Sequence, residues 1–111
     1  MTGTPDVVIV LTTIGAAADA DAFAAQLVEE RLAACVSVLP PMVSHYRWQG
    51  AIERDDERLV LIKTTASRVQ AIEARFDDLH PYDTPELLVL PVAGGGAAYL
   101  EWLVSSLDNR E

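Results

Sequence analysis

The sequence is short of cysteine, since Cys35 is the single one among its 111 residues. One thiol excludes an intrachain disulfide and gives no basis for a cysteine-rich metal framework. No stretch approaches the ~20 consecutive apolar residues that a membrane helix needs. The opening residues MTGTP also lack the basic and apolar regions of a signal peptide. These absences predict a cytoplasmic protein with no membrane partner.

Basic residues are also few, with 8 Lys and Arg against 17 Asp and Glu and a net charge of −9. This balance opposes binding to phosphate backbones and to anionic lipid head groups. We therefore expect no nucleic-acid partner, whereas a cation is a plausible ligand. A chain of this length can bury enough surface to fold alone, so we expect one domain over residues 1–111, with flexible tails at 1–5 and 108–111.

The first third of the chain predicts one strand and one helix. The run VVIVLTT at residues 7–13 is rich in β-branched side chains and is bounded by a glycine, which is typical of a buried strand. Asp19 then precedes apolar residues at helical spacing that continue to Cys35. A free thiol on such a stripe behaves as a small buried hydrophobe, so we expect Cys35 in the core.

The middle of the chain predicts a long hairpin followed by a second helix. Residues 36–65 have an extended pattern, with alternation at 44–48 on one arm and at 59–62 on the other, and Gln49-Gly50 is the natural turn. Ser67 is a candidate cap for a helix that stops at His80, because the residue before a proline leaves the helical region.

The last third predicts a strand at residues 86–92 and a helix after the glycines at 94–96. Tyr99 and Trp102 lie near the apolar face of that helix. The glycines lack the sequence context of a phosphate-binding loop, so a flexible connection is the simpler interpretation. The acidic run at residues 53–57 is most simply a solvated part of the hairpin, and the alternative is a cluster of carboxylates that attracts hard cations weakly.

The resulting order of elements is β-α-β-β-α-β plus a final helix, which is typical of an α+β, ferredoxin-like sandwich. In that topology the second and fourth strands are the edges. Pro40-Pro41 and Pro91 fall in these two strands, as expected for a residue that cannot donate to an interior ladder. The hairpin is longer than a strand pair of ~5–6 residues needs, so we expect it to contact another copy of the chain.

Several motifs, in order and spacing, resemble the CutA family of divalent-cation tolerance proteins from Val7 to Leu107. They are RLAACVSVLP at 31–40, SHYRWQGAIERDDE at 44–57, LIKTT at 61–65, HPYDTPELLVLPV at 80–92 and YLEWL at 99–103.

The resemblance implies a PII-like homotrimer of ferredoxin-like protomers that is implicated in tolerance of divalent cations, copper above all. It implies no catalytic activity and no organic cofactor, and bacterial members of the family are cytoplasmic. Some copper-binding relatives have proposed ligands where this chain has Thr12 and Leu79. At those two positions this chain lacks the ligands proposed for the copper-binding relatives, and of that ligand set only His80 is present here.

The segment HPYDTPE at residues 80–86 is the first candidate site. Two prolines stiffen it, which suits a binding site and a plain connection equally well. His80 is a candidate ligand for Cu²⁺ or another divalent cation, with Glu86 or Asp83 beside it as an oxygen donor. The alternative is a histidine that ends the helix and makes a local hydrogen bond, because tight sites usually have three or four ligands.

The second candidate is a ligand cleft between subunits, lined by Lys63, Tyr82, Glu86 and Trp102. As the PII resemblance suggests, it would bind a small metabolite or anion, and the protein would then be a signalling module. The alternative for Lys63 is a salt bridge across the subunit interface with Glu86 or Glu57.

Two further interpretations concern histidines. His45 alternates with neighbours on its strand and is more simply a rim or interface residue than a ligand. An enzyme that uses His80 and Glu86 ranks last, because no Ser or Cys nucleophile stands in a recognisable motif beside them.

Overall fold

The computed structural model describes residues 6–108. The expected tails at 1–5 and 109–111 lie outside these residues. Asp108, expected in the second tail, is described and accepts a hydrogen bond from the Arg68 guanidinium at 3.2 Å. No helix among the described residues is long and apolar enough to cross a membrane.

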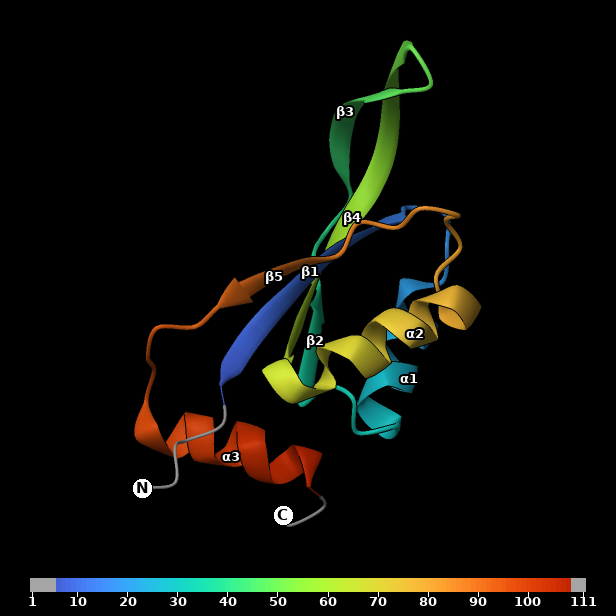
Figure 1. Cartoon of the computed structure of the whole chain (residues 1–111). Helices are drawn as coiled ribbons and strands as arrows, with labels where there is room; N and C mark the ends of the chain where they lie inside the picture. The colour runs from blue at the N-terminus through green and yellow to red at the C-terminus, as the bar shows by residue number, and fades with distance from the viewer. Residues whose placement is uncertain (1–5, 109–111) are drawn as a thin grey trace.

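The centre of the molecule is an antiparallel sheet in the order β2-β4-β1-β5, which confirms the ferredoxin-like arrangement (Figure 1). Its strands are β1 (Val7–Gly15), β2 (Cys35–Val38), β4 (Ala51–Thr65) and β5 (Leu88–Pro91). The second and fourth strands of the predicted topology, β2 and β5, are the edges of this sheet, as predicted. Pro91 lies in β5, and Pro40 and Pro41 follow β2, so proline costs the inner strands no ladder hydrogen bond.

The predicted hairpin is present, but its first arm is divided into two strands. Pro40 and Pro41 separate β2 from β3 (Met42–Trp48), and β3 then pairs with the first part of β4. The turn lies at Gln49 and Gly50, whose φ angles are 48° and 82°. Figure 1 shows this β3–β4 hairpin projecting well beyond the sheet, and the molecule measures 51 Å along its longest axis.

Helix α1 (Ala20–Glu29) begins as predicted but ends earlier. The Asp19 side chain accepts a hydrogen bond from the Ala22 N–H at 2.9 Å and so caps the first turn. At the other end Arg31 has a φ of 58°, and the Leu32 N–H donates to the Leu27 carbonyl. This is a Schellman motif, which stops the helix.

The early stop corrects the prediction for Cys35. Cys35 is the first residue of edge strand β2, not part of the helical stripe, and it is half-buried rather than in the core.

Helix α2 (Val69–Leu79) ends where the sequence predicts, but its start differs. Ser67 belongs to a short 3₁₀ turn, η1 (Ala66–Arg68), and its hydroxyl lies 3.0 Å from the Thr65 hydroxyl instead of capping the helix. Helices α1 and α2 cover one face of the sheet, and apolar side chains of both helices and of β1 and β4 form the core: Val8, Val10, Ile14, Phe23, Leu27, Val60, Ile62, Ile72 and Phe76.

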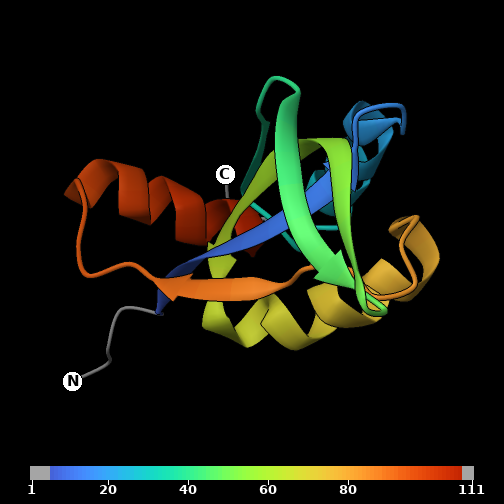
Figure 2. The same ribbon diagram turned by 90° about the horizontal axis from the view of Figure 1, so that it is seen from above.

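Helix α3 (Ala97–Leu107) lies across the end of the sheet where β1 begins (Figure 2). Its Leu103 and Leu107 pack on Val7 and Ala34 in a second apolar cluster. The Arg68 guanidinium donates to the Leu107 carbonyl at 2.8 Å and fixes the C-terminal end of the helix.

The sheet face opposite α1 and α2 carries a band of apolar side chains. The register aligns Leu11 with Leu61 on one side and with Leu88 on the other. Leu88 is 55% exposed and Leu90 is 45% exposed. This band has the character of an association surface rather than of a solvated face.

Candidate functional site

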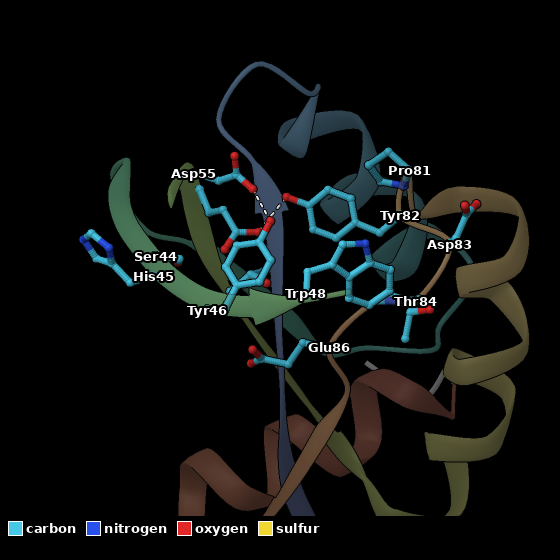
Figure 3. Close-up of a pocket in the computed structure, with 13 residues that line it drawn as sticks. Ser44, His45, Tyr46, Trp48, Asp55, Pro81, Tyr82, Asp83, Thr84 and Glu86 are labelled. Carbon is cyan, nitrogen blue, oxygen red and sulfur yellow. Dashed lines mark hydrogen bonds between the residues drawn. The ribbon is translucent and has the colours of Figure 1, made fainter. Parts of the chain in front are cut away.

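A pocket of about 820 Å³ lies between the β3–β4 hairpin and the segment at 80–86 (Figure 3). Its lining combines carboxylates and aromatic rings from two distant parts of the chain. The lining residues are Thr13, Ser44, His45, Tyr46, Trp48, Asp55, Glu57, Pro81, Tyr82, Asp83, Thr84, Pro85 and Glu86.

His80 anchors the segment at residues 80–86, which forms one side of this pocket. Its side chain is buried, with 6% exposed. Nε2 lies 2.8 Å from the Thr13 carbonyl oxygen, which can only accept, so Nε2 carries the proton. Nδ1 then accepts the Tyr82 N–H at 3.2 Å. Both ring nitrogens therefore hold the loop against β1.

The surroundings of His80 favour its neutral form. The rings of Phe23, Phe76 and Tyr82 pack around the imidazole, with their centroids 5.0 to 5.5 Å from that of the imidazole. Burial lowers the pKa of His80 below its usual value, although the Thr13 carbonyl and the charge of Glu57 act in the opposite direction. The hydrogen bonds and the burial together give His80 the helix-ending role that was the alternative to metal binding.

A metal ion at His80 would have to displace one of these hydrogen bonds. Among residues 6–108, no group of three or more His, Cys, Asp and Glu side chains is placed to hold a metal ion. Ligation by His80 and Glu86 stays a prediction, and the arrangement within one chain does not fit a closed metal site.

Glu57 and Tyr82 form the innermost polar pair of the pocket. Glu57 is 6% exposed, and its carboxylate accepts a hydrogen bond from the Tyr82 hydroxyl at 2.6 Å. Burial raises the pKa of Tyr82, and the hydrogen bond to Glu57 raises it further. The phenol therefore stays protonated and works as a donor.

Three further carboxylates line the pocket, from Asp55, Asp83 and Glu86. Asp55 accepts a hydrogen bond from the Tyr46 hydroxyl, and this bond raises the pKa of Tyr46 to about 12. Glu86 is half-buried; burial and then the charge of Glu57 raise its pKa. The described lining includes no Lys or Arg, so the pocket attracts cations and repels anions.

The predicted cleft residues divide into two groups. Tyr82 and Glu86 line the pocket, whereas Lys63 and Trp102 do not. Lys63 lies on β4 between Ile9 and Cys35. Trp102 lies on α3 with its ring 5.5 Å from that of Tyr99. One chain thus does not bring all four residues together, and a cleft shared between subunits stays a prediction.

Within the described part of the chain, Lys63 forms no salt bridge with Glu57 or Glu86. Glu57 accepts a hydrogen bond from a tyrosine instead, and no ion pair joins Lys63 to Glu86 among residues 6–108. A bridge across a subunit interface stays a prediction.

The hairpin side of the pocket was missed from the sequence. Tyr46, Trp48, Asp55 and Glu57 come from β3 and β4, and the acidic run was interpreted as a solvated stretch. Alternation along β3 was the available signal, because it places Tyr46 and Trp48 on one face. Figure 3 shows His45 pointing away from these two rings, at the rim where the sequence predicts it.

Comparisons with known proteins agree on one family. The family model described as "CutA1 divalent ion tolerance protein" matches residues 8–106. A divalent-cation tolerance protein CutA from Pectobacterium atrosepticum is 49% identical over 102 residues, covering 92% of this chain and 93% of that protein. The CutA protein of Thermus thermophilus is 46% identical over 95 residues, covering 86% and 92%.

Solved structures give the same result. The structure of the divalent cation tolerance protein from Thermus thermophilus has a TM-score of 0.86 at 44% identity, covering 90% of this chain and 97% of that one. CutA1 from Oryza sativa has a TM-score of 0.88 at 37% identity, covering 93% and 94%. The likeness in fold therefore extends over nearly the whole chain.

Proposed function

Because this chain belongs to the CutA1 divalent ion tolerance family, we propose that it serves tolerance of divalent cations, copper among them, as a non-enzymatic homotrimer in the cytoplasm. The family supports the involvement of divalent cations. The observation that carries the proposal on this chain is the pocket itself, where carboxylates converge and no described Lys or Arg lines the wall.

The proposal does not include a resident metal bound by one chain. His80 uses both ring nitrogens in hydrogen bonds, and Thr12, at a position of a proposed ligand in some relatives, lies 3.2 Å from its Nε2. A hydroxyl is a weaker ligand for copper than a thiolate. Tight copper binding would therefore need donors from two chains, and a single chain offers weak attraction through carboxylates.

The exposed apolar band of the sheet supports the homotrimer. Leu88 and Leu90 lie on the open face of edge strand β5, beside Leu11 and Ile9 of β1. Burying such side chains is worth roughly 1.5–3 kcal/mol each. Closed symmetric assemblies are the usual way in which soluble chains cover such faces.

A ligand-sensing module is the second candidate, and the size of the pocket favours it, since small-molecule sites commonly measure about 300–1,000 Å³. The carboxylates that line the pocket would repel the small anion that the sequence suggested as a ligand. A cation is the better occupant of this pocket.

The direct test of the tolerance proposal is growth in copper. A strain that lacks the gene, complemented with the wild-type chain, should grow at Cu²⁺ concentrations that stop the uncomplemented strain. The double variant Glu57→Gln, Glu86→Gln should complement less well, whereas Asp56→Asn, an exposed carboxylate beside Glu57 in sequence, should match wild type. Equal growth of the complemented and uncomplemented strains would contradict the proposal.

A further inference from the structure

Within one chain, the charge of Glu57 has no compensating cation among the described residues. Its side chain is more than nine-tenths buried, and its hydrogen-bond partner, the Tyr82 hydroxyl, is neutral. Among residues 6–108 no Lys or Arg forms an ion pair with it. A buried carboxylate without a cation is costly, so the pocket wall carries a charge that a bound cation would compensate.

Glu86 places a second carboxylate at the same pocket. It comes from the loop side, whereas Glu57 comes from β4. The described residues give Glu86 no hydrogen bond or ion pair from its side chain, and burial, followed by the charge of Glu57, disfavours its ionisation. A cation that contacts both groups would relieve this repulsion.

Three aromatic rings distinguish this pocket from a metal site. Figure 3 shows the rings of Tyr46, Trp48 and Tyr82 among the side chains that line it. Within one chain Tyr46 is 40% exposed and Trp48 is 47% exposed, and both residues line the pocket, so both rings are accessible there to an occupant. A hydrated metal ion needs oxygen, nitrogen or sulfur donors, whereas an organic ammonium ion gains from ring faces and from apolar contact with its carbon chain.

We propose that this pocket binds a small aliphatic ammonium ion. The nitrogen donates its N–H groups to Glu57 and Glu86, and the methylene chain lies against Tyr46 and Trp48. Donation requires N–H groups, so a primary amine fits better than a quaternary one. This inference goes beyond metal tolerance, because its ligand is organic and its site needs the rings.

Isothermal titration calorimetry in an amine-free buffer tests the proposal on the intact chain, with putrescine as the probe. Putrescine should bind, and succinate, a dianion with a backbone of the same length, should not. Choline, which has no N–H, should bind at least about tenfold more weakly, since one charge-assisted hydrogen bond is worth roughly that factor.

The variants separate the charge from the rings. Glu57→Gln and Trp48→Leu should each weaken putrescine binding about tenfold or more. Asp56→Asn is the matched control: it removes the same charge from the neighbouring position of β4, where the side chain is exposed, and should leave binding unchanged. Circular dichroism checks that each variant is folded.

Three results would overturn the proposal. The first is no heat of binding for putrescine at millimolar concentration. The second is equal weakening by Asp56→Asn and Glu57→Gln, which would indicate attraction by net charge alone. The third is a combined result in which Glu57→Gln no longer self-associates and wild type does not bind the amine. That result would show that a cationic side chain of a second copy pairs with Glu57. None of these outcomes depends on copper tolerance, so the two proposals can fail separately.

Discussion

His80 shows how one side chain can connect two parts of a fold. It ends α2, its Nε2–H donates to the Thr13 carbonyl on β1, and its Nδ1 accepts the Tyr82 N–H. The sequence placed a histidine at a helix end beside a proline, but it could not tell a metal ligand from a hydrogen-bonded anchor. That choice depends on the strand opposite, which is 67 residues away in sequence.

Replacing His80 tests the anchoring role. His80→Ala removes two hydrogen bonds and the packing against Phe23 and Phe76, so it should lower the free energy of unfolding by about 2–4 kcal/mol. Urea titration measures this, with His45→Ala, an exposed histidine, expected to stay within about 0.5 kcal/mol of wild type. A similar small effect for both variants would contradict the anchoring role.

The lowered pKa of His80 predicts a pH dependence. Between its folded pKa and its unfolded value of about 6.5, the unfolded chain holds the extra proton. The stability that the neutral imidazole contributes is therefore complete above about pH 6.5 and declines as the pH falls toward and through the folded pKa.

Urea titrations across this range measure the slope, which should be smaller in His80→Ala. Glu86 acts in the opposite direction, because its raised pKa favours folding as the pH falls toward that pKa. Glu86→Gln removes this contribution, so the decline in stability below about pH 6.5 should be steeper in that variant. An unchanged slope in His80→Ala would contradict the assignment to His80.

At the scale of elements, the order and type of the strands and helices could be predicted because hydrophobic period, prolines and caps agreed. Where the prediction for α1 was wrong, the apolar spacing continued past the helix, but Arg31 took a left-handed conformation that no glycine signalled. The structure therefore places Cys35 in β2 and not on the helix that the spacing predicted. The pocket was half predicted, since the loop side is local in sequence, whereas Glu57 is brought to it by the register of β4.

The hairpin turn offers a test at this scale. Gly50 has a φ of 82° and open space around it, so a methyl group there meets no neighbour but strains the backbone. Gly50→Ala should cost about 1 kcal/mol of stability. Gly94 is equally open with no positive φ, and Gly94→Ala should be neutral or slightly stabilising in thermal unfolding. Equal effects of the two changes would contradict this interpretation of the turn.

At the scale of the whole molecule, the open sheet face predicts self-association. Light scattering should give a mass of three 12.0 kDa chains for wild type. Leu90→Glu puts a charge on this face and should shift the protein toward single chains, because an unpaired charge in an apolar interface is costly. Val28→Glu, on α1 and also exposed, should leave the mass unchanged. A wild-type monomer would contradict the homotrimer.

Residues of the hairpin, of β1 and of the loop after α2 line the pocket. Its charge therefore depends on how the fold brings these three segments together. Its attraction for divalent cations is measured by equilibrium dialysis against Cu²⁺ at neutral pH, counting ions bound per chain. Wild type should retain more copper than the double variant Glu57→Gln, Glu86→Gln. The control variant Asp56→Asn should retain as much copper as wild type. Equal retention by all three proteins, or loss with His80→Ala alone, would contradict a cation pocket built from these carboxylates.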